Sequence, residues 1–487
     1  MISLKNIHFN YAGSAIGLRD INLEIARGEL VVVIGPSGCG KTTLARLCNG
    51  LIPHIYPGEL SGTLQFDGRD ASELAGWEIG QQTGVIFQDP RSQFFTDCVQ
   101  DELVFELENY GTPPAKMHSR LAITLQNMAL NDYQMAPLNT LSSGLKQKVA
   151  LAAAVMAKPE RFVMDEPTAN LDIAGVLQLQ KEISRLKHQG KTLLIVEHRI
   201  AYLMDLADRI IYMSDGEIRH IFTPAQLRAL PVEQRQRLGI APLDLYDGKI
   251  TATAPPASAP LLEVQNLSVA WRRRKVLNDI NFTLHSGEVI GLTGANGCGK
   301  TTLARSIMGL QKPASGTCRI HPTPESACPA WMVMQDTVYQ LFSDSVYNEM
   351  LLNAKGKQPQ HKAKRLLKAF GLWELRAQHP ATLSGGQKQR LTIALGLMQR
   401  ASLIILDEPT SGLDGQNAQR IGEAINHLAD SGHGVLIITH DPLLIAQTCQ
   451  RLLTLSDGKL SSDTELTQLN YRQLVERVQE VSAGYAS

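Results

Sequence analysis

Short apolar runs separated by longer amphipathic stretches recur throughout the chain. Clear examples of these runs cover residues 30–34, 193–196 and 403–406. Brief apolar runs are typical of parallel strands buried on both faces, and the stretches between them have the pattern of crossover helices. The first segments of each half alternate apolar and polar residues instead, as at residues 21–25, which predicts a small antiparallel sheet in each half. The pattern therefore predicts an α/β fold.

The two halves of the chain repeat one another. The segment GELVVVIGPSGCGKTT at 28–43 returns as GEVIGLTGANGCGKTT at 287–302, and VMDEPTANLD at 163–172 returns as ILDEPTSGLD at 405–414. The late motifs of the two halves keep a constant separation of 242 positions (165 to 407, 198 to 440), whereas the early lysines are 259 positions apart (41 to 300). A duplication with an internal length change explains this order and spacing.

A stretch rich in Pro, Ala, Ser and Thr at residues 251–260, TATAPPASAP, predicts an extended linker between the halves. We therefore predict four segments. They are the first domain of the repeat at 1–223, an appendage and linker at 224–260, the second domain of the repeat at 261–460, and a C-terminal tail at 461–487.

Composition narrows the class of protein. Of the 487 residues, 44% are hydrophobic and 19% charged, as in ordinary globular domains, and the formal net charge is zero, which lacks the basic excess of most nucleic-acid binders. The seven cysteines form no CxxC pair, which disfavours a zinc ribbon and fits a reducing compartment. No apolar run approaches the ~20 residues of a spanning helix, so any membrane crossing is expected in another polypeptide.

Two glycine-rich loops carry the clearest candidate chemistry. The segments GPSGCGKT and GANGCGKT both fit the phosphate-loop pattern, and each lies between an apolar strand and a helical run. Backbone N–H groups of such a loop bind phosphate at a helix N-terminus. Lys41 and Lys300 are expected to contact the β- and γ-phosphates of ATP, and Thr42 and Thr301 to bind Mg²⁺. The candidate nucleotide-binding residues are Gly35, Pro36, Ser37, Gly38, Cys39, Gly40, Lys41, Thr42 and Thr43 in the first half, and Gly294, Ala295, Asn296, Gly297, Cys298, Gly299, Lys300, Thr301 and Thr302 in the second.

A late apolar strand in each half ends in two acids, Asp165-Glu166 and Asp407-Glu408. A carboxylate at this end of a strand, near the phosphate loop, can ligate Mg²⁺ through water, and the next acid can polarise the attacking water. Phosphoryl transfer requires mainly positioning and charge stabilisation. The pattern thus predicts an enzyme that hydrolyses ATP with Mg²⁺.

The segment LSGGQKQR at 383–390 resembles the signature of ATP-binding-cassette (ABC) proteins. The resemblance covers both halves and implies two tandem P-loop NTPase domains of ABC type, each with a mostly parallel sheet, a small antiparallel β-subdomain and a helical subdomain. It also implies roles for residues outside the phosphate loops. These are catalytic and metal-binding glutamines (Gln88, Gln335), catalytic histidines (His198, His440) beside Glu166 and Glu408, metal-binding Asp165 and Asp407, and adenine-stacking aromatics (Tyr11, Trp271).

The two signatures differ. The second contains Ser384, Gly385 and Gly386, whereas the first contains Ser142 and Gly144 around Ser143 and has Leu145 in place of a glutamine. In the ABC family two cassettes face head to tail, with each ATP between the phosphate loop of one and the signature of the other. The resemblance therefore implies intramolecular pairing of the two cassettes. It also predicts that the site with Lys41 and Glu166, completed by the regular signature, dominates hydrolysis.

The glutamine regions, VIFQDPRSQFF at 85–95 and VMQDTVYQLF at 333–342, resemble those of energy-coupling-factor (ECF) transporter ATPases. That resemblance implies ATP-driven import of a vitamin or transition-metal ion across the cytoplasmic membrane. The implied partners are an integral-membrane scaffold subunit and a separate substrate-binding membrane protein, with no nucleic acid, and the implied location is the cytoplasmic face of the membrane. The alternatives are a soluble tandem ABC protein acting on ribosomes and the fused ATPase of another importer, such as one for sugars.

Overall fold

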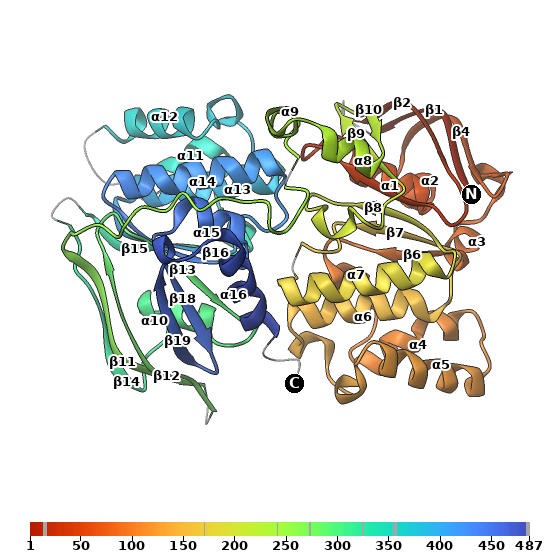
Figure 1. The fold of residues 1–487 in the computed structure, drawn as a ribbon. Coiled ribbons are helices and arrows are strands. Elements are labelled where there is room, and N and C mark those ends of the chain that lie inside the picture. The colour runs from red at the N-terminus through yellow and green to blue at the C-terminus, as the bar shows by residue number, and fades with distance from the viewer. Residues whose placement is uncertain are drawn as a thin grey trace. The chain divides into compact units, whose positions relative to one another are not determined.

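The computed structural model divides into two compact units, Met1–Asp244 and Leu245–Ser487, which we call the first and the second unit (Figure 1). Each is considered on its own. The residues that the structure describes are 1–12, 17–169, 171–240, 242–271, 274–323, 326–352, 354 and 358–483.

The first unit contains ten strands and nine α-helices in its described residues. The strands are β1 (Ile2–Tyr11), β2 (Gly17–Ile25), β3 (Leu30–Ile34), β4 (Gly58–Phe66), β5 (Arg69–Asp70), β6 (Thr83–Ile86), β7 (Arg161–Asp165), β8 (Thr192–Val196), β9 (Arg209–Ser214) and β10 (Glu217–Phe222). The helices are α1 (Lys41–Cys48), α2 (Leu51–His54), α3 (Gly76–Gln81), α4 (Val99–Asn109), α5 (Pro114–Asn127), α6 (Ser143–Met156), α7 (Ile173–His188), α8 (Pro224–Ala229) and α9 (Val232–Arg237).

The second unit repeats this plan. Its strands are β11 (Pro260–Trp271), β12 (Arg274–His285), β13 (Val289–Gly294), β14 (Ser315–Ile320), β15 (Cys328–Val333), β16 (Ala401–Asp407), β17 (Gly434–Ile438), β18 (Arg451–Ser456) and β19 (Lys459–Glu465). Its helices are α10 (Lys300–Ile307), α11 (Val346–Leu351), α12 (Pro359–Ala369), α13 (Gly385–Met398), α14 (Gly415–Asp430), α15 (Pro442–Thr448) and α16 (Tyr471–Ala483).

The large sheets of the two units have matching strand orders. The first runs β10-β9-β3-β8-β7-β6, and the second, read in the same direction, runs β19-β18-β13-β17-β16-β15. Every neighbouring pair is parallel except the outermost β9–β10 and β18–β19 pairs. Antiparallel sheets, β2-β1-β4-β5 and β12-β11-β14, complete the units. The predicted tandem α/β architecture with antiparallel and helical subdomains is confirmed.

The continuous apolar run of β3 is explained by two cores on opposite faces of the sheet. Leu30, Val32 and Ile34 point into a core shared with α6 and α7, which lie side by side in Figure 1. Val31 and Val33 point into a second core shared with α1 and the antiparallel sheet. Because side chains alternate between faces, a strand covered on both faces needs apolar residues at every position.

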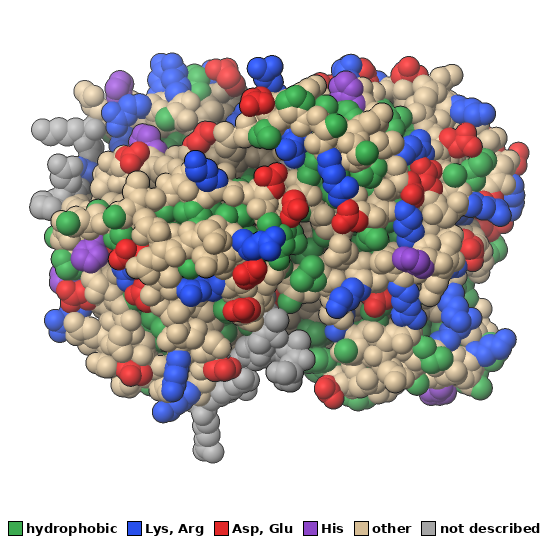
Figure 2. All heavy atoms as spheres, in the orientation of Figure 1, with side chains coloured by type: hydrophobic (Ala, Val, Ile, Leu, Met, Phe, Trp, Pro, Cys, Tyr) green, Lys and Arg blue, Asp and Glu red, His purple; other side chains and the backbone are tan. Residues whose placement is uncertain are grey.

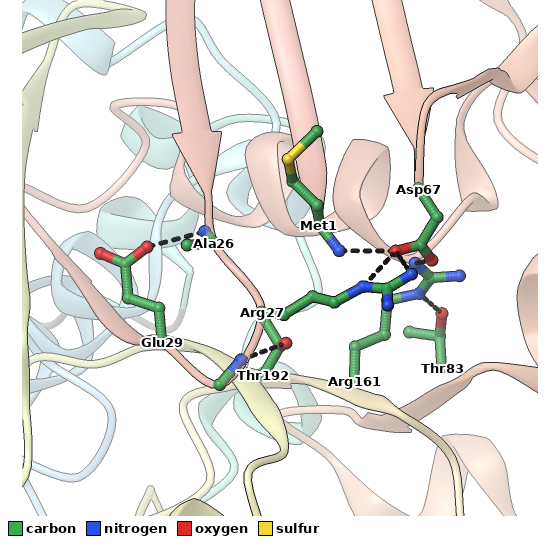
Figure 3. A network of polar contacts seen from close by, with 9 residues as sticks. Met1, Ala26, Arg27, Glu29, Asp67, Thr83, Arg161 and Thr192 are labelled. Carbon is green, nitrogen blue, oxygen red and sulfur yellow. Dashed lines mark hydrogen bonds and ion pairs between the residues drawn. The ribbon is translucent and has the colours of Figure 1, made fainter.

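A polar network joins the antiparallel subdomain of the first unit to its parallel sheet (Figure 3). The buried Arg161 guanidinium, at the start of β7, donates from Nε to Thr83 Oγ1 at 2.8 Å and lies 3.1 Å from Asp67 Oδ2. Arg27 also contacts Asp67, which sits in the turn between β4 and β5. Partial burial would raise the pKa of Asp67, but the hydrogen bond from the Met1 ammonium at 2.8 Å, with Arg27 and Arg161, lowers this pKa to about 2. Buried charges are retained when they are paired and hydrogen-bonded in this way.

The length difference between the halves is located before the glutamine regions and in the helical subdomains. The first unit has α2, β5 and α3 between α1 and β6. Between α10 and β15 of the second unit, the described residues form one strand, β14, and no helix. The segment predicted as a linker packs on the second unit, where Thr251 N donates to Ala446 O at 2.9 Å. The four-segment division remains a prediction.

Two further features concern membrane-spanning helices and the charge of the surface. None of the helices formed by the described residues combines the length and apolar character needed to cross a membrane. On the face drawn in Figure 2, basic and acidic side chains are interspersed, in keeping with the zero net charge of the sequence.

Candidate functional site

The phosphate loops connect β3 to α1 and β13 to α10, as predicted. Each helix begins directly at the lysine, after a glycine in the left-handed conformation, Gly40 with φ 102° and Gly299 with φ 113°. A Cβ at Gly40 would also lie 2.8 Å from Leu18 Cδ2, so both conformation and space require glycine there. At the loop crests only conformation favours glycine, because Gly38 and Gly297 have φ of +80° and +83° but a Cβ there would meet nothing within 4 Å.

The lysines of both loops curl back over the loop backbone. Lys41 Nζ donates to Gly35 O and Pro36 O, both at 2.9 Å. Lys300 Nζ makes the matching bonds to Gly294 O at 2.6 Å and Ala295 O at 3.1 Å. Both ammonium groups are largely buried, so each charge is fixed at the mouth of an open glycine loop, an arrangement that fits a bound phosphate.

Cys39 and Cys298 lie buried in these loops, and burial raises the pKa of both thiols. They are therefore held as neutral thiols.

The first acid of each strand end lies against the loop threonine. Asp165 accepts a hydrogen bond from the Thr42 side chain, and in the second unit Thr301 Oγ1 donates to Asp407 Oδ2 at 3.3 Å. Burial, assisted by the neighbouring Glu166 charge, raises the pKa of Asp165 to about 6, and burial also raises that of Asp407. Asp165 Oδ1 is buried and has no partner among the described residues. A hydroxyl, a carboxylate and an unpaired oxygen fit a divalent cation that prefers oxygen ligands.

The second acid of the first unit is held between two side chains. Gln88 Nε2 donates to Glu166 Oε2 at 2.6 Å, and His198 Nε2 lies 3.1 Å from Glu166 Oε1. These groups come from the ends of β6, β7 and β8, three adjacent parallel strands. Glu166 has φ +47°, a left-handed conformation that is rare outside glycine and typical of functional sites.

The second unit forms a similar arrangement, with a longer distance between acid and histidine. Glu408 also has a positive φ, +49°. His440 Nε2 lies 3.5 Å from Glu408 Oε1, and Thr439 Oγ1 donates to Glu408 Oε2 at 3.4 Å. Gln335 follows the end of β15, the position that Gln88 has after β6. The structure thus brings the predicted acid and histidine together in both units.

The predicted adenine-stacking residues have different outcomes. Tyr11, at the end of β1, shares a hydrogen bond with Thr43 Oγ1 at 3.2 Å, and Arg46 Nη1 donates to its hydroxyl at 2.9 Å. The ring is therefore tied to the helix that follows the phosphate loop. The side chain of Trp271 lies outside the described part of the structure.

The signature serines begin long helices. Ser384 Oγ accepts from Gln387 N at 3.4 Å while Gln387 Oε1 accepts from Ser384 N at 2.8 Å, a complete capping box at the start of α13. Ser142 Oγ accepts from Leu145 N at 3.3 Å at the start of α6, but Leu145 has no side-chain acceptor to return the bond. The replacement of a signature glutamine by leucine therefore removes half of the cap.

Gly385, Gly386 and Gly144 lie in the first turns of these helices. A Cβ at Gly386 would lie 2.9 Å from Asn417 Cγ, whereas at Gly385 it would meet only Leu413, at 3.8 Å. The Gly385 position thus has room for a side chain, whereas the Gly386 position does not.

Sequence reasoning did not identify three buried acids near the site, Glu102, Glu349 and Glu197. Buried Glu102 Oε2 accepts from the backbone N–H of Phe95 and Thr96, both at 3.0 Å, and buried Glu349 does the same for Phe342 and Ser343. These carboxylates fix the loops that follow the glutamines. Glu197, directly before His198, is also buried and is treated below. The signal that could have identified Glu102 and Glu349 is the acid at the same position in both helical subdomains.

Known proteins resemble this chain along most of its length. A family model described as "ABC transporter" matches residues 18–169 and 277–411, more than half of the chain. The chain belongs to the ABC transporter family. It is 41% identical over 94% of its length to a "Putative ABC transporter ATP-binding protein" of Treponema denticola, of which 96% is covered. It is 32% identical over 95% of its length to a "Putative HMP/thiamine import ATP-binding protein YkoD" of Bacillus subtilis, of which 92% is covered.

ABC ATP-binding domains are ATPases that use ATP, so the prediction of an ATPase is confirmed, as is membership of the two-cassette ABC ATP-binding proteins. The finer resemblance to ECF ATPases is not established by these matches.

Two solved structures match nearly the whole chain. One, a complex of an archaeal ribosomal stalk protein with the archaeal ribosome recycling factor aABCE1, has a TM-score of 0.68 at 23% identity and covers 98% of this chain and 92% of the matched chain. The other, "RNase-L Inhibitor", has a TM-score of 0.65 at 22% identity and covers 97% and 92%. At this identity the matches show a shared tandem ABC fold.

These matches contradict the predicted import machinery. Two solved structures that span the chain are described as a complex of an archaeal ribosome recycling factor and as a model of ribosome-bound archaeal Pelota and ABCE1, and neither description names an importer. The predictions of vitamin or metal import, of a membrane scaffold and a substrate-binding membrane protein without nucleic acid, and of a location at the cytoplasmic face of the membrane are therefore corrected. They depended on the glutamine-loop motifs, which specify loop geometry but not the occupant of the adjoining surface.

Proposed function

We propose that the chain hydrolyses ATP with Mg²⁺ at one site in each unit and couples the hydrolysis to mechanical work on a macromolecular partner. The observation that best supports this proposal is the position of Glu166, held at 2.6 Å by Gln88 and 3.1 Å by His198 at the end of a buried strand. A carboxylate held in this way is suited to orient an attacking water.

The remaining residues divide into those for the phosphates, those for the base and those for the metal. Lys41 and Lys300 bind the phosphates together with the loop glycines, and Tyr11 and Trp271 contact the base. Two helix N-termini are available to a γ-phosphate. Their residues are Ser142 and Gly144 at the start of α6, and Ser384, Gly385 and Gly386 at the start of α13. The side chains that would hold Mg²⁺ are Thr42, Gln88 and Asp165 in the first unit, and Thr301, Gln335 and Asp407 in the second. When bound, Mg²⁺ neutralises phosphate charge as it develops.

A direct test of the two-site proposal compares ATP turnover by the full chain with that of Glu166→Gln, Glu408→Gln and the double variant. We expect the double variant to bind ATP but to lose turnover by on the order of 100-fold or more. Turnover that persists in the double variant would contradict the assignment of both acids.

The partner class supported by the matches that span the chain is a ribosomal particle. The formal net charge of zero provides little long-range attraction to RNA, so binding would depend on local contacts.

The partner can be identified with the double Glu→Gln variant, which is expected to remain in the ATP-bound state. Cell extract is supplied with ATP or with ADP, and the particles and membranes that retain the variant are separated by sedimentation. ATP-dependent recovery with ribosomal subunits supports the ribosomal partner. Recovery with an integral-membrane protein instead would overturn it, and would support the ECF resemblance of residues 85–95 and 333–342 together with the import named for the Bacillus subtilis relative.

A further inference from the structure

Glu197 is a buried acid directly before the histidine of the first unit. Its side chain is 2% exposed, and both of its oxygens accept hydrogen bonds. Oε2 accepts from Thr168 Oγ1 at 2.7 Å and from Tyr202 Oη at 3.2 Å. Oε1 accepts from His198 N at 2.8 Å and, more weakly, from Arg199 N at 3.4 Å. Donors on both oxygens offset the cost of burying the carboxylate.

These donors belong to the two segments that present the catalytic groups. Thr168 lies two residues after Glu166, on the segment that leaves β7, and the His198 amide lies on the segment that leaves β8. Tyr202 lies in the short 3-10 turn Ala201–Leu203 that continues the second segment. Glu197 therefore links the segment of Glu166 to the segment of His198 through a single carboxylate.

The second unit makes the same link with a different residue. Thr439 takes the place of Glu197, and Thr410, the equivalent of Thr168, donates to Asp441 Oδ2 at 2.9 Å. Asp441 replaces Arg199, and buried Leu444 replaces Tyr202. The Thr439 hydroxyl donates instead to Glu408. The link between the two segments is thus present in both units, whereas its acceptor has moved by two residues.

We propose that Glu197 is a positioning residue that holds His198 and Glu166 in register for ATP hydrolysis in the first unit, as Asp441 does for His440 and Glu408 in the second. The inference rests on the proposed role of Glu166. Glu197 itself does not touch the reacting groups in the structure. Its loss would free the Thr168 segment from the His198 segment and widen the 3.1 Å separation of the catalytic pair. A displaced catalytic group lowers the reaction rate, because the rate depends on the alignment of the reacting atoms.

The test uses the full chain with Glu408→Gln, so that the remaining turnover comes from the first unit. In this background Glu197→Thr removes the acceptor for Thr168 and Tyr202, and we expect kcat to fall about 10- to 100-fold with KM for ATP nearly unchanged. The triple change Glu197→Thr, Arg199→Asp, Tyr202→Leu transplants the link of the second unit and is expected to restore most of kcat. Arg199→Asp alone is the control for loss of the arginine.

Glu197→Gln is the conservative variant. Its carbonyl oxygen can keep the bonds from the backbone N–H groups, and its amide can donate to the Thr168 and Tyr202 hydroxyls, which rotate to accept. We expect its kcat to stay close to that of the parent. If Glu197→Thr fails to fold, the triple variant and Glu197→Gln decide the matter, because a folded triple variant with kcat as low as that of Glu166→Gln overturns the proposal.

Two outcomes separate this inference from the proposed function. If Glu166→Gln and Glu408→Gln leave turnover unchanged, the assignment of the acids fails, whatever Glu197 does. If those variants behave as expected but Glu197→Thr keeps full kcat, or if the triple variant folds without restoring it, the positioning role of Glu197 is wrong while the function stands.

Discussion

The strand-end acids of the two units lie on equivalent strands and differ in their distance from the neighbouring histidine. Glu166 has contacts of 2.6 and 3.1 Å with Gln88 and His198, whereas Glu408 has contacts of 3.4 and 3.5 Å with Thr439 and His440. The two units also differ at one neighbouring position, where Glu197, a carboxylate that links two segments, corresponds to Thr439, a hydroxyl that contacts the acid. A duplicated site can therefore keep every catalytic residue and still diverge through the residues behind them.

The phosphate loops show the opposite behaviour. Their glycine conformations and lysine contacts agree between the units within a few tenths of an ångström. A loop whose backbone groups are to bind phosphate would tolerate little variation, as expected for the proposed nucleotide sites. The comparison therefore predicts equal binding and unequal hydrolysis.

The largest expected effect is on hydrolysis. Glu166→Gln should lower steady-state ATP turnover on the order of 100-fold, because it removes the acid that lies closer to its histidine, whereas Glu408→Gln should leave most of the turnover. Glu160→Gln, an exposed acid paired with Lys191, serves as the control. Strong inhibition by Glu408→Gln together with near-normal turnover of Glu166→Gln would reverse the comparison.

The second prediction concerns nucleotide binding, which should be symmetric. Lys41→Ala and Lys300→Ala each remove a buried charge at a phosphate loop, and each should weaken ATP at its own site by about 10- to 100-fold. Titration with a fluorescent ATP analogue should then show one tight site in each single variant and none in the double variant. Two tight sites in either single variant would show that its lysine does not bind nucleotide.

The third prediction concerns pH and a difference in the helical subdomains. Burial raises the pKa of Glu106, in α4, from 4.5 to about 7, whereas the equivalent position in the second half is Asn353. Between these pH values the folded state binds the proton more strongly than the unfolded state, so the free energy of unfolding falls as pH rises from about 4.5 to about 7.

Glu106→Gln should therefore raise the free energy of unfolding at pH 8 by about 1–2 kcal/mol, after allowance for the partial exposure of the side chain, and change it little at pH 4. Urea unfolding at both pH values measures the effect, and exposed Glu108→Gln is the matched control in the same helix. An equal effect of Glu106→Gln at both pH values would exclude titration as the cause.

The smallest expected effect is at the signature helices. Gln387→Leu, which copies the first unit, should lower the free energy of unfolding by about 0.5–1 kcal/mol by breaking the capping box of α13, and Gln387→Glu should preserve it. Leu145→Gln should gain less, because Leu145 packs against the core of the first unit. Hydrogen exchange in the first turns of α13 and α6 measures both changes, and unchanged exchange in Gln387→Leu would show that the box contributes nothing.

Much of the fold could be predicted because its signals are local. The apolar runs of β3 and β8 fix buried strands, and glycines before Lys41 and Lys300 fix the loops, since only glycine suits the conformation of Gly40 and Gly299. The acids and histidines could be assigned for a related reason: parallel strands all end at the same edge of a sheet, which brings the ends of β6, β7 and β8 together.

The sequence was a poorer guide to what lies outside the chain. The motifs at 85–95 and 333–342 predicted a membrane scaffold, and the structural matches contradict it. Exposed side chains such as Phe95 and Phe342 show that a surface is available but do not define its occupant.

The sequence by itself determined the repeat, the nucleotide loops, the strand-end acids and the ATPase activity, because each depends on residues close together in the chain or on strict chain order. Only the tertiary structure decided how each acid is held. Glu197 and Thr168 are 29 positions apart, and the same link in the second unit uses Asp441 instead, so no single pattern encodes it. The hydrogen-bond partner of a buried side chain is set by the segments that packing brings within 3 Å of it, and packing depends on the whole unit.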